Sequence, residues 1–414
     1  MHFLALTPGS RHVGIGPRRK RPYRPRLRSS VPVLAALAAM TLVGSAAFTA
    51  GWMLRILQPE RHHAPYPALI TVEAEIQRTY HMGTGPVSGI AYSPDGRWLA
   101  ATTSDGGVVV QQAAAGQQGN KRYTPQRTGG ATGLTFNPEA TTLAVGTSSG
   151  DVLLWSVPHG RQLAALGAPA GRASAITGTA FSPDGRILAA ANLRGMVQLW
   201  DVSDPRSPTA LATPARLDSV TDVAFDHRSA TLAVGSIDGT VQLWDVSDPR
   251  HPEVLTTLES DQPVTSVGYS PDDAILAAGG SDGTTQFWNI HDLPDSRTTE
   301  NVLGRPASIL PAANPQASAA SRSPQVPRGV GSITGLVFTS NRRIAASTAG
   351  GYVQVWDINN SRRPKLLLPP ARPQAFTSLS YDTASSTLAI GAANGTVQVW
   401  AADADDDRTG PALR

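Results

Sequence analysis

Short runs in which apolar and polar residues alternate occur along most of this chain, and small-residue turns separate them. The stretch from Ser236 to Asp245 (SIDGTVQLWD) is one example, because Val241 and Leu243 alternate there with polar residues. Alternation at a period of two predicts a half-buried strand. The Asp238-Gly239 pair predicts a two-residue hairpin turn before it, since glycine accepts the positive φ that such a turn requires.

The same unit recurs at regular intervals. Each of six copies ends on a tryptophan, and successive tryptophans are 45, 44, 44, 68 and 44 residues apart: Trp155, Trp200, Trp244, Trp288, Trp356 and Trp400. A second unit, such as Val223-Ala-Phe225, lies upstream of each of them. One further copy follows Ile90-Ala-Tyr92 and has Gln111 where the others have tryptophan. Seven copies with a period of roughly 40 to 45 residues, each holding several short strands, indicate propeller blades.

Two motifs make the chain resemble the WD-repeat family of β-propellers over about Ile76 to Trp400. The Trp-Asp dipeptide occurs at 200–201, 244–245 and 356–357, and Ser-Pro-Asp-Gly occurs at 93–96 and 182–185. The Gly-His pair that many members carry is missing, so the resemblance does not extend to their buried His-Ser-Asp-Trp hydrogen-bond network.

This resemblance implies an all-β fold, a seven-bladed β-propeller of four-stranded antiparallel blades. A strand from Leu69 to Thr79 would complete the last blade and close the ring, because an open ring leaves backbone groups unpaired. The six tryptophans, with the turn residues Asp105, Asp238 and Asp282, would have structural roles within the blades.

The N-terminal region differs from the rest in composition. Residues 1–30 contain eight arginines and lysines, four prolines and no acidic residue, which indicates a disordered basic arm. Residues 31–54 carry no charge and are long enough to cross a bilayer as a transmembrane helix, a signal anchor. The positive-inside rule then places the N-terminus in the cytoplasm and the propeller on the extracytoplasmic side of a single-pass protein. A cleaved signal peptide and a buried helix of the soluble domain are the alternatives.

The remaining boundaries follow from composition. Residues 55–68 are expected to be a linker, and residues 69–402 the propeller. The 68-residue spacing before Trp356 indicates an insertion rich in Pro, Ala and Ser at 305–331. Residues 403–414 are expected to be a disordered acidic tail.

Charge separates the arm from the propeller. The chain has 35 Lys and Arg against 31 Asp and Glu, and eight of the basic residues lie in the arm. The propeller is therefore slightly acidic, and the sequence pI of about 9.6 belongs largely to the arm. For this reason no nucleic-acid binding is expected of the folded domain.

Candidate chemistry is sparse. The chain has no cysteine, which excludes disulfides and cysteine-ligated metals, and we find no phosphate loop, zinc-protease motif or nucleophile elbow. No catalytic, cofactor-binding or metal-binding residues are assigned.

The resemblance favours a non-enzymatic scaffold that binds a protein or peptide. A sensor of small molecules or cell-envelope glycans is the alternative, and a propeller-hosted enzyme is a third hypothesis. Arginines of turns expected on one face are candidates for a partner surface, with solvated turns as the plainer interpretation: Arg206, Arg250, Arg362 and Arg363.

Overall fold

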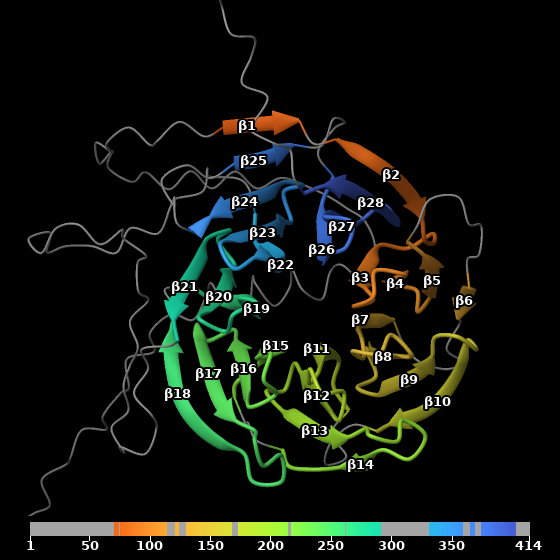
Figure 1. Cartoon of the computed structure of the whole chain (residues 1–414), viewed down its shortest axis with the longest axis vertical. Coiled ribbons are helices and arrows are strands. Elements are labelled where there is room, and N and C mark those ends of the chain that lie inside the picture. Colours follow the sequence, from red (N-terminus) through yellow and green to blue (C-terminus); the bar gives the residue numbers. More distant parts are fainter. Residues whose placement is uncertain are drawn as a thin grey trace, which may run out of the picture. The chain divides into compact units, whose positions relative to one another are not determined.

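The computed structural model describes residues 70–73, 75–113, 121–123, 130–167, 173–213, 217–260, 262–290, 331–358, 365–368 and 374–402. Within these ranges, 28 strands form seven sheets. The sheets follow one another around a ring as the blades of a propeller, as Figure 1 shows. The seven copies counted in the sequence are thus confirmed as seven blades. The basic arm, the expected transmembrane span at 31–54 and the linker lie outside the described residues, among which no helix is long and apolar enough to span a membrane.

The first four blades contain four strands each. Blade one consists of β3 (Val87–Tyr92), β4 (Trp98–Thr103), β5 (Val108–Gln112) and β6 (Lys121–Tyr123). Blade two consists of β7 (Ala131–Phe136), β8 (Thr142–Thr147), β9 (Val152–Ser156) and β10 (Arg161–Leu166). Blade three consists of β11 (Ile176–Phe181), β12 (Ile187–Asn192), β13 (Val197–Asp201) and β14 (Thr209–Ala210). Blade four consists of β15 (Val220–Phe225), β16 (Thr231–Ser236), β17 (Thr240–Asp245) and β18 (Glu253–Glu259).

The last three blades vary in strand number. Blade five has three strands in the described residues: β19 (Val264–Tyr269), β20 (Ile275–Gly280) and β21 (Thr285–Asn289). Blade six has five: β22 (Ile333–Ser340), β23 (Arg343–Thr348), β24 (Val353–Asp357), β25 (Lys365–Leu368) and β1 (Ile70–Glu73). Blade seven has four: β26 (Phe376–Asp382), β27 (Thr387–Ala392), β28 (Thr396–Ala401) and β2 (Ile76–His81).

The ring closes through the N-terminal segment, as expected from the sequence. The innermost strands contact one another in chain order from β3 to β26, and β26 in turn contacts β3. The strand β2 pairs antiparallel with β28, with Thr79 opposite Gln398, and so completes blade seven. Residues from the two ends of the propeller therefore share one sheet.

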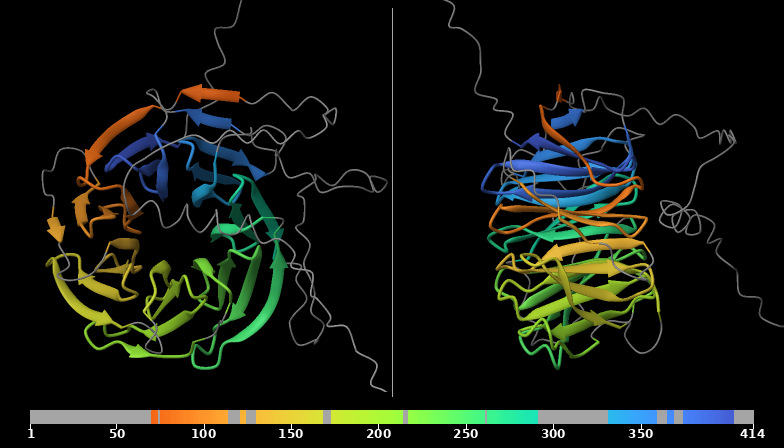
Figure 2. Two further views of the ribbon diagram at one scale, coloured as in Figure 1. Left: turned by 180° about the vertical axis from the view of Figure 1, so that it is seen from behind. Right: turned by 90° about the vertical axis from the view of Figure 1, so that its right-hand side faces the viewer.

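The same N-terminal segment also adds a strand that was not expected. The strand β1 pairs in parallel with β25 at the rim of blade six, with Ile70 opposite Lys365 and Glu73 opposite Leu368. Both views in Figure 2 show β1 outermost, beside β25. The expected strand at Leu69 to Thr79 is thus two strands, which join two different blades.

The recurring tryptophans all occupy the same place in their blades. Each lies on the third strand, opposite an aliphatic residue of the second strand, as Trp244 does opposite Leu232. The exposed fraction of each of these six side chains is between 0% and 8%: Trp155, Trp200, Trp244, Trp288, Trp356 and Trp400. Gln111 takes the position in blade one, opposite Leu99, and is buried too. Trp244 packs with residues of blade three such as Leu199, so the core is built between blades.

The hairpins between second and third strands differ from the expected two-residue turn. Three residues separate β16 from β17, Ile237 to Gly239, and the N–H of Gly239 donates to Ser236 O at 3.2 Å. Gly239 has a φ of +89°, as a three-residue hairpin loop with a left-handed last residue requires. The expectation of a glycine at positive φ is confirmed, and the expected loop length is wrong.

Candidate interaction surface

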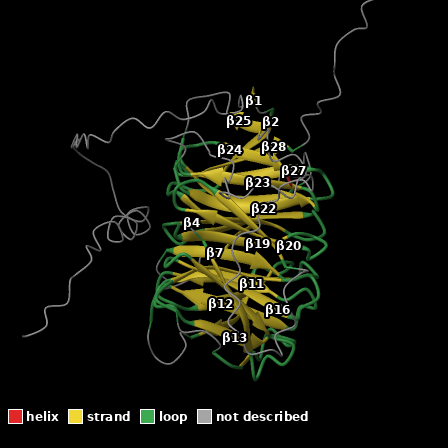
Figure 3. Ribbon diagram, turned by 90° about the vertical axis from the view of Figure 1, so that its left-hand side faces the viewer, coloured by secondary structure: helices red, strands yellow, loops and turns green. Residues whose placement is uncertain are grey.

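Loops gather on two opposite faces of the blades, as the side view in Figure 3 shows. Because neighbouring strands are antiparallel, the turns between first and second strands lie at the same strand ends as the loops after the third strands. Hydrogen bonds join these two sets, for example from Val246 N to Ala230 O (2.8 Å) and from Ala402 N to Ser386 O (3.0 Å). We call this side the turn face. It comprises the turns at 93–96, 137–140, 182–185, 226–229, 270–273, 340–342 and 383–386, with the loops after the third strands.

Carboxylates on the turn face accept hydrogen bonds from the backbone of their own turns. In the first Ser-Pro-Asp-Gly turn, Asp95 accepts hydrogen bonds from Ser93 Oγ and from Arg97 N (3.1 Å). Asp184 repeats both contacts in blade three. Both aspartates therefore shape their turns.

Two adjacent blades present nearly identical loops on the turn face. In blade three, Asp204 Oδ1 accepts from Arg206 N at 3.0 Å, and in blade four Asp248 Oδ1 accepts from Arg250 N at 3.0 Å. Since Asp-Pro starts both loops in the same way, the chain displays one structural unit twice, 44 residues apart.

Both arginines of these loops are exposed. No ion pair involves the guanidinium of Arg206 or Arg250 in the part of the chain that the structure describes. The pKa of the nearby Asp201 carboxyl is lowered, first by hydrogen bonds from Ser203 and less by the charges of Arg250 and Arg186. The charge of Arg250 in blade four therefore helps to lower the pKa of a carboxyl group in blade three. Arg362 and Arg363, the other two candidates, lie outside the described residues.

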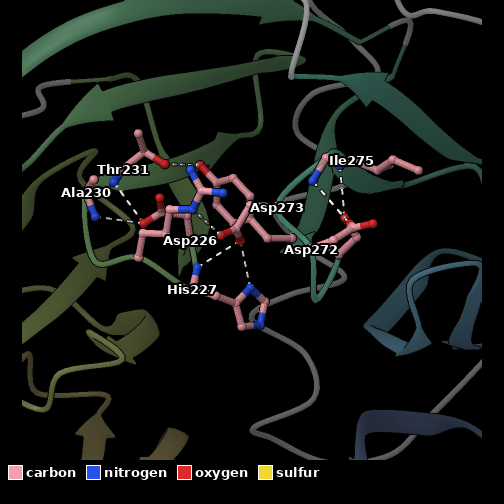
Figure 4. Close-up of polar contacts among 11 residues, drawn as sticks. Asp226, His227, Ala230, Thr231, Asp272, Asp273 and Ile275 are labelled. Atoms are coloured by element: carbon pink, nitrogen blue, oxygen red, sulfur yellow. Dashed lines mark hydrogen bonds and ion pairs between the residues drawn. The ribbon is translucent and has the colours of Figure 1, made fainter.

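The turns of blades four and five are joined by a contact that the sequence did not predict (Figure 4). Asp273 Oδ1 accepts from His227 N at 2.9 Å and lies 2.7 Å from His227 Nδ1, and its Oδ2 lies 3.9 Å from Arg228 Nε. Asp273 has a φ of +57° at the position where two other turns have glycine. An aspartate in place of that glycine was the available signal.

A second contact between these blades lies deeper. Thr231 Oγ1 and Tyr269 Oη are 3.2 Å apart, and burial raises the pKa of the Tyr269 hydroxyl. Tyr92 and Thr387 make the same contact between blades one and seven at 3.2 Å, and burial raises the pKa of Tyr92 to about 12. Both phenols are held protonated near neutral pH and serve to join blades.

The three turn aspartates named from the sequence lie on the face opposite the turn face. Asp238 accepts from Thr240 N (2.9 Å) and Thr240 Oγ1 (2.7 Å), and Asp282 makes the same pair of contacts with Thr284. Asp105 accepts from Thr103 Oγ1, a bond that lowers the pKa of its carboxyl. All three brace hairpin loops.

The buried indoles do not form a shared polar network. Nε1 of Trp244, Trp288 and Trp356 has no hydrogen-bond partner in the described ranges, whereas Trp400 Nε1 donates to Gln398 Oε1 at 3.0 Å. Their contribution is mainly apolar packing. No group of three or more metal-ligating side chains occurs in the described residues.

Two family models match parts of the chain. One, described as "Nucleolar protein 10-like, N-terminal domain", matches residues 156–274, which run from the end of β9 to the turn of blade five. The other, described as "WD domain, G-beta repeat", matches residues 75–110, which include β2 and most of blade one. The chain is a seven-bladed propeller in which residues 75–110 match a WD repeat. WD-repeat propellers commonly bind proteins or peptides and are generally non-enzymatic. A comparison with curated proteins gave no match.

Proposed function

We propose that this WD-repeat propeller is a membrane-tethered, non-enzymatic scaffold that binds a protein or peptide on its extracytoplasmic side. The observation that carries the binding role is the pair of equivalent loops on blades three and four, which display Arg206 and Arg250. Their backbone is fixed by Asp204 and Asp248, so a partner would meet preformed contacts and lose little free energy to ordering.

The tether is supported by sequence. Residues 31–54 carry no charge, and eight basic residues precede them. Such a segment is long enough to span a bilayer, and the charge bias orients its N-terminus toward the cytoplasm. The linker would then lead to β1 and β2 at the rim of blades six and seven.

Crosslinking in the membrane fraction tests the binding surface. We expect the full chain to give a defined adduct, and the double variant Arg206→Glu/Arg250→Glu to reduce its yield by about tenfold, since two exposed contacts are each worth up to about 1 kcal/mol. Arg194→Glu is the matched control, because Arg194 is exposed on the opposite face. Equal loss in the control variant, or an unchanged adduct in the double variant, contradicts the proposed surface.

Protease accessibility tests the orientation separately. Intact cells, or spheroplasts where an outer membrane is present, are treated with protease and probed for epitopes at both ends. We expect loss of the C-terminal epitope and a protected N-terminal fragment ending near residue 60. A C-terminal epitope that is cleaved only after lysis would place the propeller in the cytoplasm.

A further inference from the structure

The contact surface between blades four and five, which we call the four–five seam, carries titratable side chains at two separate places. On the turn face, His227 of blade four contacts Asp273 of blade five through its backbone N–H and through imidazole Nδ1 (Figure 4). On the innermost strands, Asp222 of β15 accepts hydrogen bonds from Ser266 Oγ and Val267 N of β19. The same two blades are therefore joined twice through groups that can gain or lose a proton.

The seam between blades seven and one is joined by groups that do not titrate near neutral pH. Tyr92 N donates to Ser380 Oγ at 2.9 Å, and Tyr92 Oη lies 3.2 Å from Thr387 Oγ1. Burial raises the pKa of this phenol to about 12, so it stays protonated. In the part of the chain that the structure describes, no other neighbouring turns are joined by a histidine and a carboxylate. The four–five seam therefore differs from the others in its titratable groups.

Protonation of Asp222 favours a closed four–five seam. Burial raises the pKa of Asp222 to about 6, although hydrogen bonds from the uncharged donors Val267 N, Ser266 Oγ and Val223 N oppose the shift. In an opened seam the carboxyl group meets water and titrates near 3.9. Between about pH 4 and 6 the closed seam therefore binds more protons than the open one. Closure is favoured as the pH falls through this window and is weakened as the pH rises through about 6.

Protonation of His227 acts in the same direction. Histidine is the side chain that ordinarily changes charge between about pH 5 and 8. A second ring proton turns the contact between Nδ1 and Asp273 Oδ1, which are 2.7 Å apart, into an ion pair. The other charged groups around this pair are Asp226 and Arg228 of the same turn and Asp272 of the blade-five turn. Three carboxylates against one guanidinium favour the added positive charge.

We propose that the four–five seam is a pH-sensitive element of the ring, which closes more tightly as the pH falls from about 7.5 to 5. The two titratable contacts hold the seam at its innermost strands and at its turn face, so they resist opening at both places. Tyr269, which joins the same blades through Thr231, stays protonated over this range and does not vary. The response goes beyond the scaffold function, because it needs no partner.

Hydrogen exchange of the full chain at about pH 5 and about pH 7.5, resolved to single amides, tests the proposal. The protection factor corrects for the intrinsic pH dependence of exchange and reports how often each part of the seam opens. For Val267 N–H, whose acceptor is Asp222, we expect protection about tenfold higher at the lower pH. For His227 N–H, whose acceptor is Asp273, we expect a rise of about two- to fivefold, the effect of an exposed ion pair.

Tyr92 N–H is the matched control, because it joins blades seven and one through an uncharged acceptor, Ser380 Oγ. Its protection should be the same at both pH values. An equal rise at Tyr92 and Val267 would mean that these amides exchange only through global unfolding, and it would overturn the proposal. Unchanged protection at either Val267 or His227 would overturn it as well.

Three variants assign the response to its two groups. His227→Gln should remove the response of its own backbone amide, and Asp222→Asn should remove the response at Val267. Ser266→Ala keeps the carboxyl group but removes one donor to its ionised form, so the response at Val267 should move to higher pH. This variant also replaces Asp222→Asn if urea unfolding shows that Asp222→Asn is not folded. A response at Val267 that persists in Asp222→Asn, or that keeps its midpoint in Ser266→Ala, would contradict the role of Asp222.

Discussion

Asp222 Oδ2 accepts a hydrogen bond from Ser266 Oγ at 3.0 Å and so joins the innermost strands of blades four and five. The same oxygen accepts from Val267 N (3.0 Å), and Oδ1 accepts from Val223 N (2.9 Å). Gly178 of blade three packs close by, since a Cβ there would lie 3.0 Å from Asp222 Oδ1. One carboxylate thus lies where three blades meet, and its donors are all uncharged.

The first prediction is a pH dependence of stability that comes from this carboxylate. Burial raises the pKa of Asp222 to about 6, although its three hydrogen bonds oppose the shift. In the unfolded chain an aspartate titrates near 3.9. Between about pH 4 and 6 the folded state therefore binds more protons, and the free energy of unfolding falls as the pH rises, by up to about 3 kcal/mol.

Urea unfolding of the wild type and Asp222→Asn from pH 4 to 8 measures this effect. The difference between the two proteins should change across the pH window and be constant above pH 7. Aspartates whose pKa is lowered, such as Asp105 and Asp272, stabilise the fold less as the pH falls. This change is the same in both proteins, so it cancels in the difference between them. A difference that is independent of pH would show that Asp222 titrates normally.

The second prediction concerns the packing of the blade tryptophans. Trp244→Ala should lower the free energy of unfolding by about 3 to 5 kcal/mol, because it leaves a cavity between blades three and four. Val254→Ala is the control, since Val254 is 47% exposed on β18 and should change stability by less than about 0.5 kcal/mol. Far-ultraviolet circular dichroism in urea measures both, and similar losses in the two variants would contradict the assignment of Trp244 to the core.

The third prediction separates the two N-terminal strands. Replacing Ile76–His81 by a Gly-Ser sequence of equal length should lower the melting temperature by many degrees, because β2 closes the ring through β28. The same replacement of Ile70–Glu73 should have a much smaller effect, because β1 only adds an outer parallel strand to blade six. A larger loss from the second replacement would mean that β1 is the strand that holds the ring together.

Features that depend on a local sequence pattern could be predicted, whereas contacts between residues far apart in the chain could not. The repeat predicted the blade number, because each copy carries its own alternation. The resemblance to WD-repeat propellers predicted the closing strand. The parallel pairing of β1 was not predictable, because four alternating residues fit the edge of any blade. Asp-Gly marks both two- and three-residue hairpins, so it did not fix the loop length at Gly239. The contact of His227 with Asp273 joins turns 46 residues apart. The aspartate at a glycine position marked the blade-five turn as unusual, but it did not identify its partner in blade four.

The last prediction concerns the closest backbone approach at a hairpin loop. Gly195 has a φ of +76°, and a Cβ on it would lie 1.6 Å from Leu217 O. The same two residues are joined by a hydrogen bond from Leu217 N to Gly195 O at 2.9 Å. In Gly195→Ala, the left-handed backbone of the alanine costs about 1 to 2 kcal/mol of stability. The new Cβ also displaces the Leu217 backbone.

We expect Gly195→Ala to lower the free energy of unfolding by about 3 kcal/mol or more, measured by urea unfolding. Gly167→Ala is the matched control, because a Cβ at Gly167 would have nothing within 4 Å and its φ is not in the left-handed region. That variant should lie within about 0.5 kcal/mol of the wild type or be slightly more stable, since alanine restricts the unfolded chain. If both variants unfold at the same urea concentration, Leu217 does not pack against Gly195 in solution.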